Sequence, residues 1–241
     1  MPGTYNEDVQ MWGKNRKLIG FDRDSCIIYS GTGLYDSPAL EANIGLVKNL
    51  TIISGNDNGL SEDSQVAKSY GIHIEYANNT EYSVTFENCH VISYLNSGFG
   101  IGCRWNQTIN ILNCVIETKA TKFWSGSHAT YFAPGGVLVH NDANAGHSAD
   151  SHGLLNIENC EIIGAVKAFD VHSLDNGNTM SIRFIRNLLY QGENKDTENV
   201  VNYYVGPGKG IEPYFCGTDI KLDSLSYGNN SNEVDYDKYW N

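Results

Sequence analysis

The chain has 241 residues, among them 25 Gly and 5 Pro, and its 16 basic and 28 acidic residues give a net charge of −12 at pH 7. This negative charge repels polyanions, so nucleic acid and an anionic membrane surface are disfavoured as partners. No apolar run reaches the length of a membrane span, and the opening MPGTYNEDVQ lacks the basic start and apolar middle of a signal peptide. Length and composition favour one large all-β domain over residues 1–241, as a module or fragment of a longer protein.

Two series of alternating segments repeat along the chain. In the first series a strand, a two-residue corner and a second short strand follow one another, at 45–54, 84–93, 109–118, 155–164, 182–191 and 220–229. The second series, which lies upstream of the first in each repeat, consists of single strands at 71–76, 98–103, 136–141, 168–173 and 200–205. Helical periodicity is nearly absent. The pattern predicts an all-β, right-handed parallel β-helix of about seven or eight coils, with loops inserted at the corners.

Two ladders should mark the corner of the first series. Asn49, Asn88, Asn113 and Asn159 take one position, where Asn tolerates the left-handed backbone conformation and its amides can bond along the stack. The next position holds Leu50, Cys89, Cys114 and Cys160, which should point into the core. We expect buried, reduced cysteines, and the spacing also leaves one disulfide open.

Four stretches of the chain stand out: PGTYNEDV (2–9), KLIGFDRDSCIIYSG (17–31), NCHVISYLNSG (88–98) and NCEIIGAVKAFDV (159–171). Together they resemble the pectin methylesterase family of the pectin lyase-like parallel β-helix superfamily. The resemblance implies the same right-handed fold. It does not extend to the catalytic residues: Leu95 and Asn96 stand where the family has a Gln and a general-acid Asp. Lys167 replaces the nucleophilic or basic Asp, and Tyr70 replaces an earlier Gln. Ester hydrolysis by that mechanism is therefore not expected.

Another site is predicted on the outward face of the second series. His73, Glu75, His140, Asp170 and His172 should line this face as a groove. The catalytic candidates are Glu75, His140, Asp170 and His172, as acid and base of a glycosidase or lyase. Glu75 and Asp170 lie three coils apart, about 14 Å, too far for a direct carboxylate pair. The other interpretation is an ordinary polar outer face. The substrate-binding candidates are Arg104, Trp105, Trp124, Tyr131, Asp142 and Tyr204, which offer aromatic stacking and hydrogen bonds to a sugar.

Three predicted loops contain side chains that could bind a metal ion or a sugar. Residues 140–152 and 55–64 carry His, Asp and Glu, but their spacings fit no standard zinc or calcium pattern, so we interpret both as solvated turns. We expect no metal and no other cofactor. The aromatic residues of 122–136 either contact a saccharide or pin the loop to the coils.

These patterns favour a catalytically diverged β-helix module that engages a carbohydrate polymer, as in phage tail spikes or bacterial surface and secreted proteins. That setting is extracellular, on a cell surface or on a virion. One alternative is an active polysaccharide hydrolase or lyase that uses the face of His140, Asp170 and His172. A second is a purely structural fibre spacer, as a homo-oligomer and often a trimer.

The two ends of the predicted solenoid should differ. At the C-terminus, the aromatic residues Tyr236, Tyr239 and Trp240 of segment 233–241 are expected to fold back over the final coil. At the N-terminus, the first coil is expected to be open, either continuing upstream or pairing with another chain.

Overall fold

The computed structural model describes most of the chain. The described residues are 1–11, 15–30, 38–55, 70–74, 82–94, 96–103, 107–119, 135–141, 152–164, 167–174, 179–191, 201–205, 213–216, 219–221 and 226–227. No helix in these ranges is long and apolar enough to cross a membrane. The tail aromatics Tyr236, Tyr239 and Trp240 lie outside the described residues, so the expected C-terminal cap stays a prediction.

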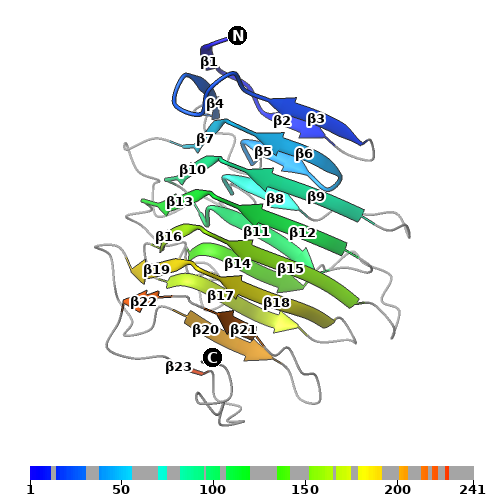
Figure 1. The fold of residues 1–241 in the computed structure, drawn as a ribbon, viewed down its shortest axis with the longest axis vertical. Helices are drawn as coiled ribbons and strands as arrows, with labels where there is room; N and C mark the ends of the chain where they lie inside the picture. The colour runs from blue at the N-terminus through cyan, green and yellow to red at the C-terminus, as the bar shows by residue number, and fades with distance from the viewer. Residues whose placement is uncertain are drawn as a thin grey trace, which may run out of the picture.

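The described residues form 23 strands in three all-parallel sheets, which the chain visits in the fixed order A, B, C (Figure 1). Sheet A contains β1 (Gly3–Tyr5), β4 (Cys26–Ser30), β7 (Thr51–Ser54), β10 (His90–Ser93), β13 (Val115–Thr118), β16 (Glu161–Gly164), β19 (Leu188–Gln191) and β22 (Asp219–Lys221). Sheet B contains β2 (Val9–Met11), β5 (Leu40–Ala42), β8 (Ile72–Ile74), β11 (Phe99–Cys103), β14 (Gly135–Asn141), β17 (Lys167–Leu174), β20 (Val201–Val205) and β23 (Ser226–Tyr227). Sheet C contains β3 (Arg16–Ile19), β6 (Gly45–Lys48), β9 (Tyr82–Glu87), β12 (Gln107–Leu112), β15 (His152–Glu158), β18 (Thr179–Ile185) and β21 (Pro213–Cys216).

This topology is a right-handed parallel β-helix, as the sequence predicts. Except at the two ends of each sheet, every described strand pairs with the strand one coil before it and the strand one coil after it, so sequence neighbours belong to different sheets. Sheets A and B hold eight strands each, which gives eight coils. One predicted segment is wrong in detail: residues 220–229 are not a copy of the strand–corner–strand unit. Within that range β22 belongs to sheet A and β23 to sheet B, and the corner from sheet C to sheet A in the last coil lies earlier, between β21 and β22.

The core lies inside the stack and follows the two-residue alternation of the strands. On sheet B the inward residues Ile72, Ile74, Phe99, Ile101, Val137, Val139 and Phe169 are all at most 1% exposed, as predicted. Phenylalanine rings meet edge to face across sheets, Phe86 with Phe99 at 5.1 Å between centroids and Phe169 with Phe184 at 4.8 Å. Each such side chain contributes about 1.5–3 kcal/mol by leaving water. The coils are therefore held together by a continuous apolar column.

The asparagine ladder at the corner from sheet C to sheet A is confirmed. Asn49, Asn88, Asn113 and Asn159 all have positive φ, between 51° and 56°. Asn88 Nδ2 donates to Asn49 Oδ1 at 2.9 Å, and Asn159 Nδ2 donates to Asn113 Oδ1 at 3.2 Å. Asn suits this position because its short side chain tolerates the left-handed region and bonds to the neighbouring coil.

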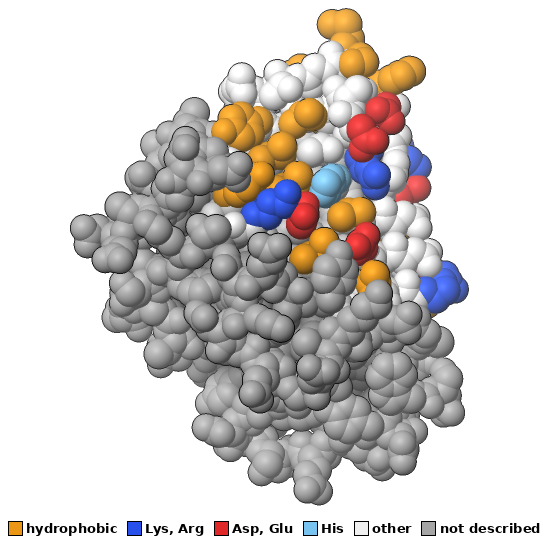
Figure 2. Space-filling model, turned by 90° about the vertical axis from the view of Figure 1, so that its left-hand side faces the viewer, with side chains coloured by type: hydrophobic (Ala, Val, Ile, Leu, Met, Phe, Trp, Pro, Cys, Tyr) orange, Lys and Arg blue, Asp and Glu red, His pale blue; other side chains and the backbone are white. Residues whose placement is uncertain are grey.

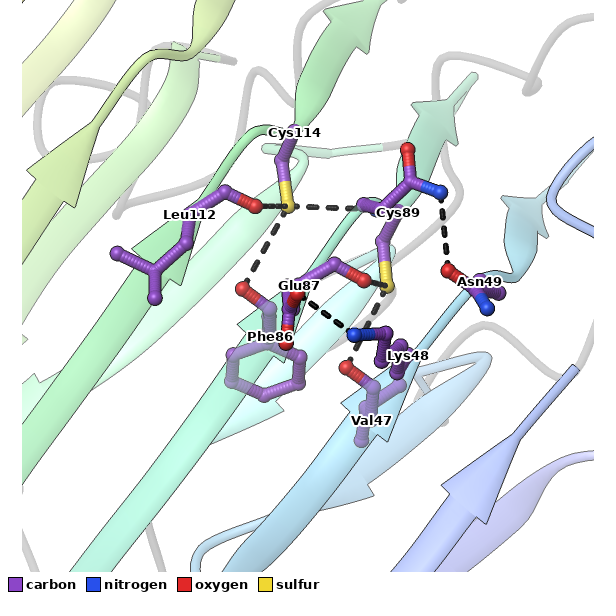
Figure 3. A network of polar contacts seen from close by, with 9 residues as sticks. Val47, Lys48, Asn49, Phe86, Glu87, Cys89, Leu112 and Cys114 are labelled. Atoms are coloured by element: carbon purple, nitrogen blue, oxygen red, sulfur yellow. Dashed lines mark hydrogen bonds and ion pairs between the residues drawn. The ribbon is translucent and has the colours of Figure 1, made fainter.

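The cysteine ladder beside it is also confirmed. Cys89, Cys114 and Cys160 are free thiols, each at most 3% exposed. The backbone N–H of Cys89 donates to Cys114 Sγ, and the N–H of Cys114 donates to Cys160 Sγ, both at 3.4 Å. Figure 3 shows this network with the Cys89 thiol 3.7 Å from the carbonyl oxygen of Val47 and the Cys114 thiol 3.7 Å from that of Phe86. The thiols therefore bond to backbone groups of the adjacent coils.

Asn187 takes the same role one coil later. It occupies the position after Arg186, the next corner residue with positive φ. Asn187 Oδ1 accepts from the N–H of Cys160 at 2.8 Å, and Asn187 Nδ2 donates to the carbonyl of Ile157 at 2.8 Å. A carboxamide and a thiol thus fill one structural role, which is to satisfy buried backbone groups at the corner.

Candidate functional site

The outer face of sheet B carries the residues predicted for catalysis. Along one row of this face, the register pairs His73 with Gly100, Gly100 with Leu138, and Leu138 with Asp170. His140 pairs directly with His172, two residues after Asp170 on the same strand. His140, Asp170 and His172 therefore occupy neighbouring backbone positions on β14 and β17.

Burial on this face differs from the expected open groove. His73 is 3% exposed, Leu138 0% and Asp170 1%. The Tyr70 ring stacks on the His73 ring, with 5.0 Å between centroids and 24° between planes. A Cβ at Gly100 would lie 2.6 Å from the Tyr70 ring, so glycine leaves room for it. Because Tyr70 covers the strands here, this part of the face is closed.

A carboxylate lies beside the stacked pair. Glu41, which pairs in register with His73, places Oε1 3.5 Å from His73 Nδ1. Tyr70 is 2% exposed. The carboxylate and the stacked rings of Tyr70 and His73 form a compact polar cluster between β5, β8 and β11.

The remaining site candidates lie outside what the structure describes. Glu75, Arg104, Trp105, Trp124, Tyr131 and Asp142 are not among the described residues. Only the backbone position is described for His140, His172 and Tyr204, and the same holds for Lys167. Their assignment as site residues stays a prediction. Loops 140–152 and 55–64 fall largely outside the described ranges, and among the described residues no group of three His, Cys, Asp or Glu is placed to hold a metal ion.

Asn96 and Tyr70, the two described positions at which the predicted resemblance would place catalytic groups, have structural contacts here. Asn96 is 4% exposed, and its Oδ1 accepts from the N–H of Ser97 at 2.7 Å. Ser97 Oγ in turn accepts from the N–H of Gly135 at 3.0 Å. Asn96 thus shapes the turn between sheets A and B, and Tyr70 closes the face of sheet B. Leu95 is outside the described residues.

A second surface, on the outer face of sheet A, did not emerge from the sequence. We call it the sheet A patch, and it consists of Tyr29, Ile53, His90, Ile92, Tyr94, Glu117 and Lys119. Figure 2 shows this side of the molecule, where hydrophobic side chains gather over the upper coils beside a histidine and charged groups. All seven side chains are at least partly exposed.

The polar part of the sheet A patch is centred on Glu117. Its Oε2 lies 3.4 Å from Lys119 Nζ and 3.5 Å from His90 Nε2. Lys119 Nζ also lies 6.0 Å from the centroid of the Tyr94 ring. Burial lowers the pKa of His90, although Glu117 opposes this shift, so the imidazole is neutral at pH 7. The negative charge of Glu117 and the positive charge of Lys119 then cancel, so the patch has no net charge.

The sequence did hold a signal for this surface. Tyr29, Ile53 and Ile92 alternate with buried residues in three repeats, at the position that faces outward. A polar outer face would carry polar side chains there, so repeated large apolar residues indicate contact with another molecule.

Comparisons with models of protein families, with curated proteins and with solved structures each return no match. The class of protein therefore follows from the topology alone: the chain is a right-handed parallel β-helix.

Proposed function

We propose that this chain is a catalytically diverged β-helix module that engages a carbohydrate polymer through the sheet A patch. The observation that carries the proposal is the combination, on one exposed strand face, of two tyrosine rings with a hydrogen-bonding group of Glu117, Lys119 and His90. Carbohydrate sites use this combination because a sugar ring has an apolar face and a rim of hydroxyl groups. The setting that fits such a module is extracellular, on a cell surface or a virion.

The charge of the surface favours a neutral saccharide. The chain as a whole carries −12, which repels acidic polymers. The sheet A patch is balanced within itself, since Glu117 is held by Lys119 and His90 is neutral. Hydroxyl groups of a neutral sugar can accept from Lys119 and donate to Glu117 without leaving either charge unpaired.

The patch also suits a chain-like ligand. Its members lie on or directly after β4, β7, β10 and β13, four successive strands of sheet A, which lie about 4.8 Å apart. Tyr29 and Glu117 stand at the two ends of one register row, with Ile53 and Ile92 between them. The surface therefore extends along the solenoid axis, and several sugar units can lie on it.

A glycan array tests the proposal directly. Wild type should bind one or more neutral oligosaccharides without releasing products, and Tyr94→Ala should weaken that binding about tenfold or more, since a stacked ring contributes roughly 1–2 kcal/mol. Arg183→Ala is the control, because Arg183 is exposed on β18 of sheet C and not on the patch. The proposal is wrong if no saccharide binds, or if both variants bind like wild type.

A second candidate function is polysaccharide cleavage by hydrolysis or elimination on the outer face of sheet B. The observation that favours it is the register of β14 and β17, which puts His140, Asp170 and His172 at neighbouring positions. Product release from a polysaccharide library that Asp170→Asn or Glu75→Gln abolishes would support cleavage. Turnover that survives both substitutions would exclude this pair of carboxylates.

A further inference from the structure

His90 lies on β10 within the sheet A patch, between two adjacent coils. The register pairs it with Thr51 of β7 and with Val115 of β13. Glu117 follows Val115 by two residues on β13, so its side chain lies diagonally across from His90 on the same outer face. His90 is therefore the neighbour of a carboxylate that the proposed function assigns to hydrogen bonding with sugar hydroxyl groups.

The imidazole of His90 has a buried nitrogen that is not hydrogen-bonded. This atom, Nε2, makes no hydrogen bond to any residue that the structure describes. It lies 3.5 Å from Glu117 Oε2, which is longer than the 2.7–2.9 Å or so of a charge-assisted hydrogen bond. The same carboxylate oxygen lies 3.4 Å from Lys119 Nζ. One carboxylate oxygen therefore lies between two basic groups, of which one is charged and the other is neutral at pH 7.

The other charged side chains around His90 are paired or distant. On the side of β7, the nearest charge belongs to Arg23, in the turn before β4, and it pairs with Asp24 at 3.2 Å. On the side of β13, Glu161 of β16 is two coils away from His90, about 9.6 Å along the stack. Within the described ranges, Glu117 is thus the acidic group that a charged imidazole would contact.

Burial and the neighbouring charges set the protonation of His90. Burial is the main cause that lowers the pKa of His90, and the positive charges of Arg23 and Lys119 lower this pKa further. Glu117 opposes them, but the pKa stays below the ordinary value of 6.5. The imidazole is therefore neutral at pH 7, and it takes up a proton when the solution becomes mildly acidic.

We propose that His90 is a positioning residue for Glu117, and that its protonation draws the carboxylate inward and weakens saccharide binding by the sheet A patch. This inference rests on the proposed function of that patch. The charged imidazole donates from Nε2 to Glu117 Oε2, so their separation shortens from 3.5 Å to hydrogen-bond length. Because Nε2 is buried, the carboxylate moves toward the strands and away from a bound sugar. The patch also gains one positive charge.

Saccharide binding at two pH values tests the inference. The probe is one array of neutral oligosaccharides, read at about pH 7.5 and about pH 5, on either side of the imidazole titration. The dissociation constant of wild type should rise about tenfold at the lower pH, because the sugar loses a charged hydrogen-bond acceptor. His90→Gln takes up no proton there, so its dissociation constant should be equal at the two pH values, whatever its size. His73→Gln, which removes a histidine from sheet B, should keep the pH dependence of wild type.

The titration of His90 in the free protein is a second measurement, which needs no ligand. The NMR signal of the imidazole Cε1–H, assigned by its absence in His90→Gln, gives the pKa of His90. Glu117→Gln should lower this pKa, because the carboxylate stabilises the charged imidazole. Lys119→Gln should raise it, because a neighbouring positive charge is removed. The two variants thus form a matched pair with opposite expected signs.

The outcomes separate this inference from the proposed function. Wild-type binding that is equal at both pH values overturns the inference and leaves the proposed function intact. A loss of binding in acid that persists in His90→Gln also overturns it, because another group is then responsible. So does a pKa of His90 that Glu117→Gln fails to lower. If no saccharide binds at the higher pH, the proposed function is wrong and this inference falls with it.

Discussion

At the corner between sheets C and A, five of the described residues adopt the left-handed conformation. Four of them are asparagines, and the fifth is Arg186, with φ of 52°. Arg186 Nε donates to Asn159 Oδ1 at 2.8 Å, so the arginine continues the ladder by a different group. Its guanidinium also pairs with Glu158. The backbone conformation is thus kept where the residue type changes, because the stack of bonds along the corner supports it.

Replacing Asn88 tests how much this corner contributes. Asn88→Ala should lower the free energy of unfolding by about 1–3 kcal/mol, since Ala loses the bond to Asn49 and resists positive φ. Asn88→Gly should cost less, about 0.5–1.5 kcal/mol, because Gly adopts positive φ readily and only the side-chain bond is lost. Urea unfolding measures the free energy of unfolding of the two variants relative to wild type. Equal losses would show that the backbone conformation is not the limiting factor.

The buried thiols predict an alkaline limit of stability. The hydrogen bond to Cys114 and burial raise the pKa of Cys89, and burial and the bond to Cys160 raise the pKa of Cys114. In the unfolded chain both thiols ionise near the ordinary value of 9.0. Below that pH both states keep the proton, and their contribution to stability is fully present. Above it only the unfolded chain releases protons, so stability falls as pH rises.

Urea unfolding at several pH values from about 8 to about 10 measures this effect. Each thiol that ionises only on unfolding adds about 1.4 kcal/mol per pH unit to the loss. Cys114→Ala should therefore show a shallower decline with pH than wild type, whatever its stability at neutral pH. Parallel declines for the two proteins would mean that Cys114 ionises in the folded state.

At the scale of the element, a small residue stands at the start of four successive strands of sheet B, β8, β11, β14 and β17. Gly71, Gly98 and Gly136 occupy equivalent positions in successive coils, and Ala168 takes that position in the next. A Cβ at Gly98 would lie 2.5 Å from Ile116 Cγ2 and 2.8 Å from the carbonyl oxygen of Gly136. The corner from sheet A to sheet B is therefore packed too closely for a side chain.

Gly98→Ala should destabilise the protein by overpacking. We expect a loss of about 1–3 kcal/mol in the free energy of unfolding, because Ile116 and the Gly136 backbone must move apart. Thermal unfolding followed by circular dichroism gives the shift, with Ser83→Ala at an exposed position of β9 as a control that leaves the corner intact. A melting temperature unchanged in Gly98→Ala would show that the two coils separate freely.

At the scale of the whole molecule, eight coils share one column of core and three sheets. Each coil contacts mainly its neighbours, so stability is close to a sum over the contacts between adjacent coils. The rigid rod that results presents long flat faces, and loops or outward side chains can change without altering the fold.

The protein should have no pectin methylesterase activity. Asn96 and Tyr70, at positions where the predicted resemblance would place catalytic groups, are buried in structural contacts, and the amide of Asn96 cannot act as a general acid. Methanol release from methylated pectin measures the activity. Release above that of a heat-inactivated sample would contradict the prediction, and a substitution at Leu95 or Lys167 would then locate the source.

Sequence patterns predict this fold well, because each coil repeats the same requirements. The Asn and Cys positions were predictable, since every copy needs a left-handed corner and a small buried residue after it. The closure of sheet B was not, because Tyr70 acts on Gly100 from a neighbouring coil. The sheet A patch was missed for a similar reason: Tyr94 meets Glu117 and Lys119 only after two adjacent coils are stacked.

The corner ladders make the coils interchangeable. From Cys89 to Cys114 the chain advances 25 residues and one coil, and at both ends it meets the same thiol and carbonyl contacts. A duplicated stretch of this length would form the same thiol and backbone hydrogen bonds with the coil before it and the coil after it. We therefore expect that duplicating or deleting one such 25-residue repeat lengthens or shortens the solenoid by one coil, which is about 4.8 Å.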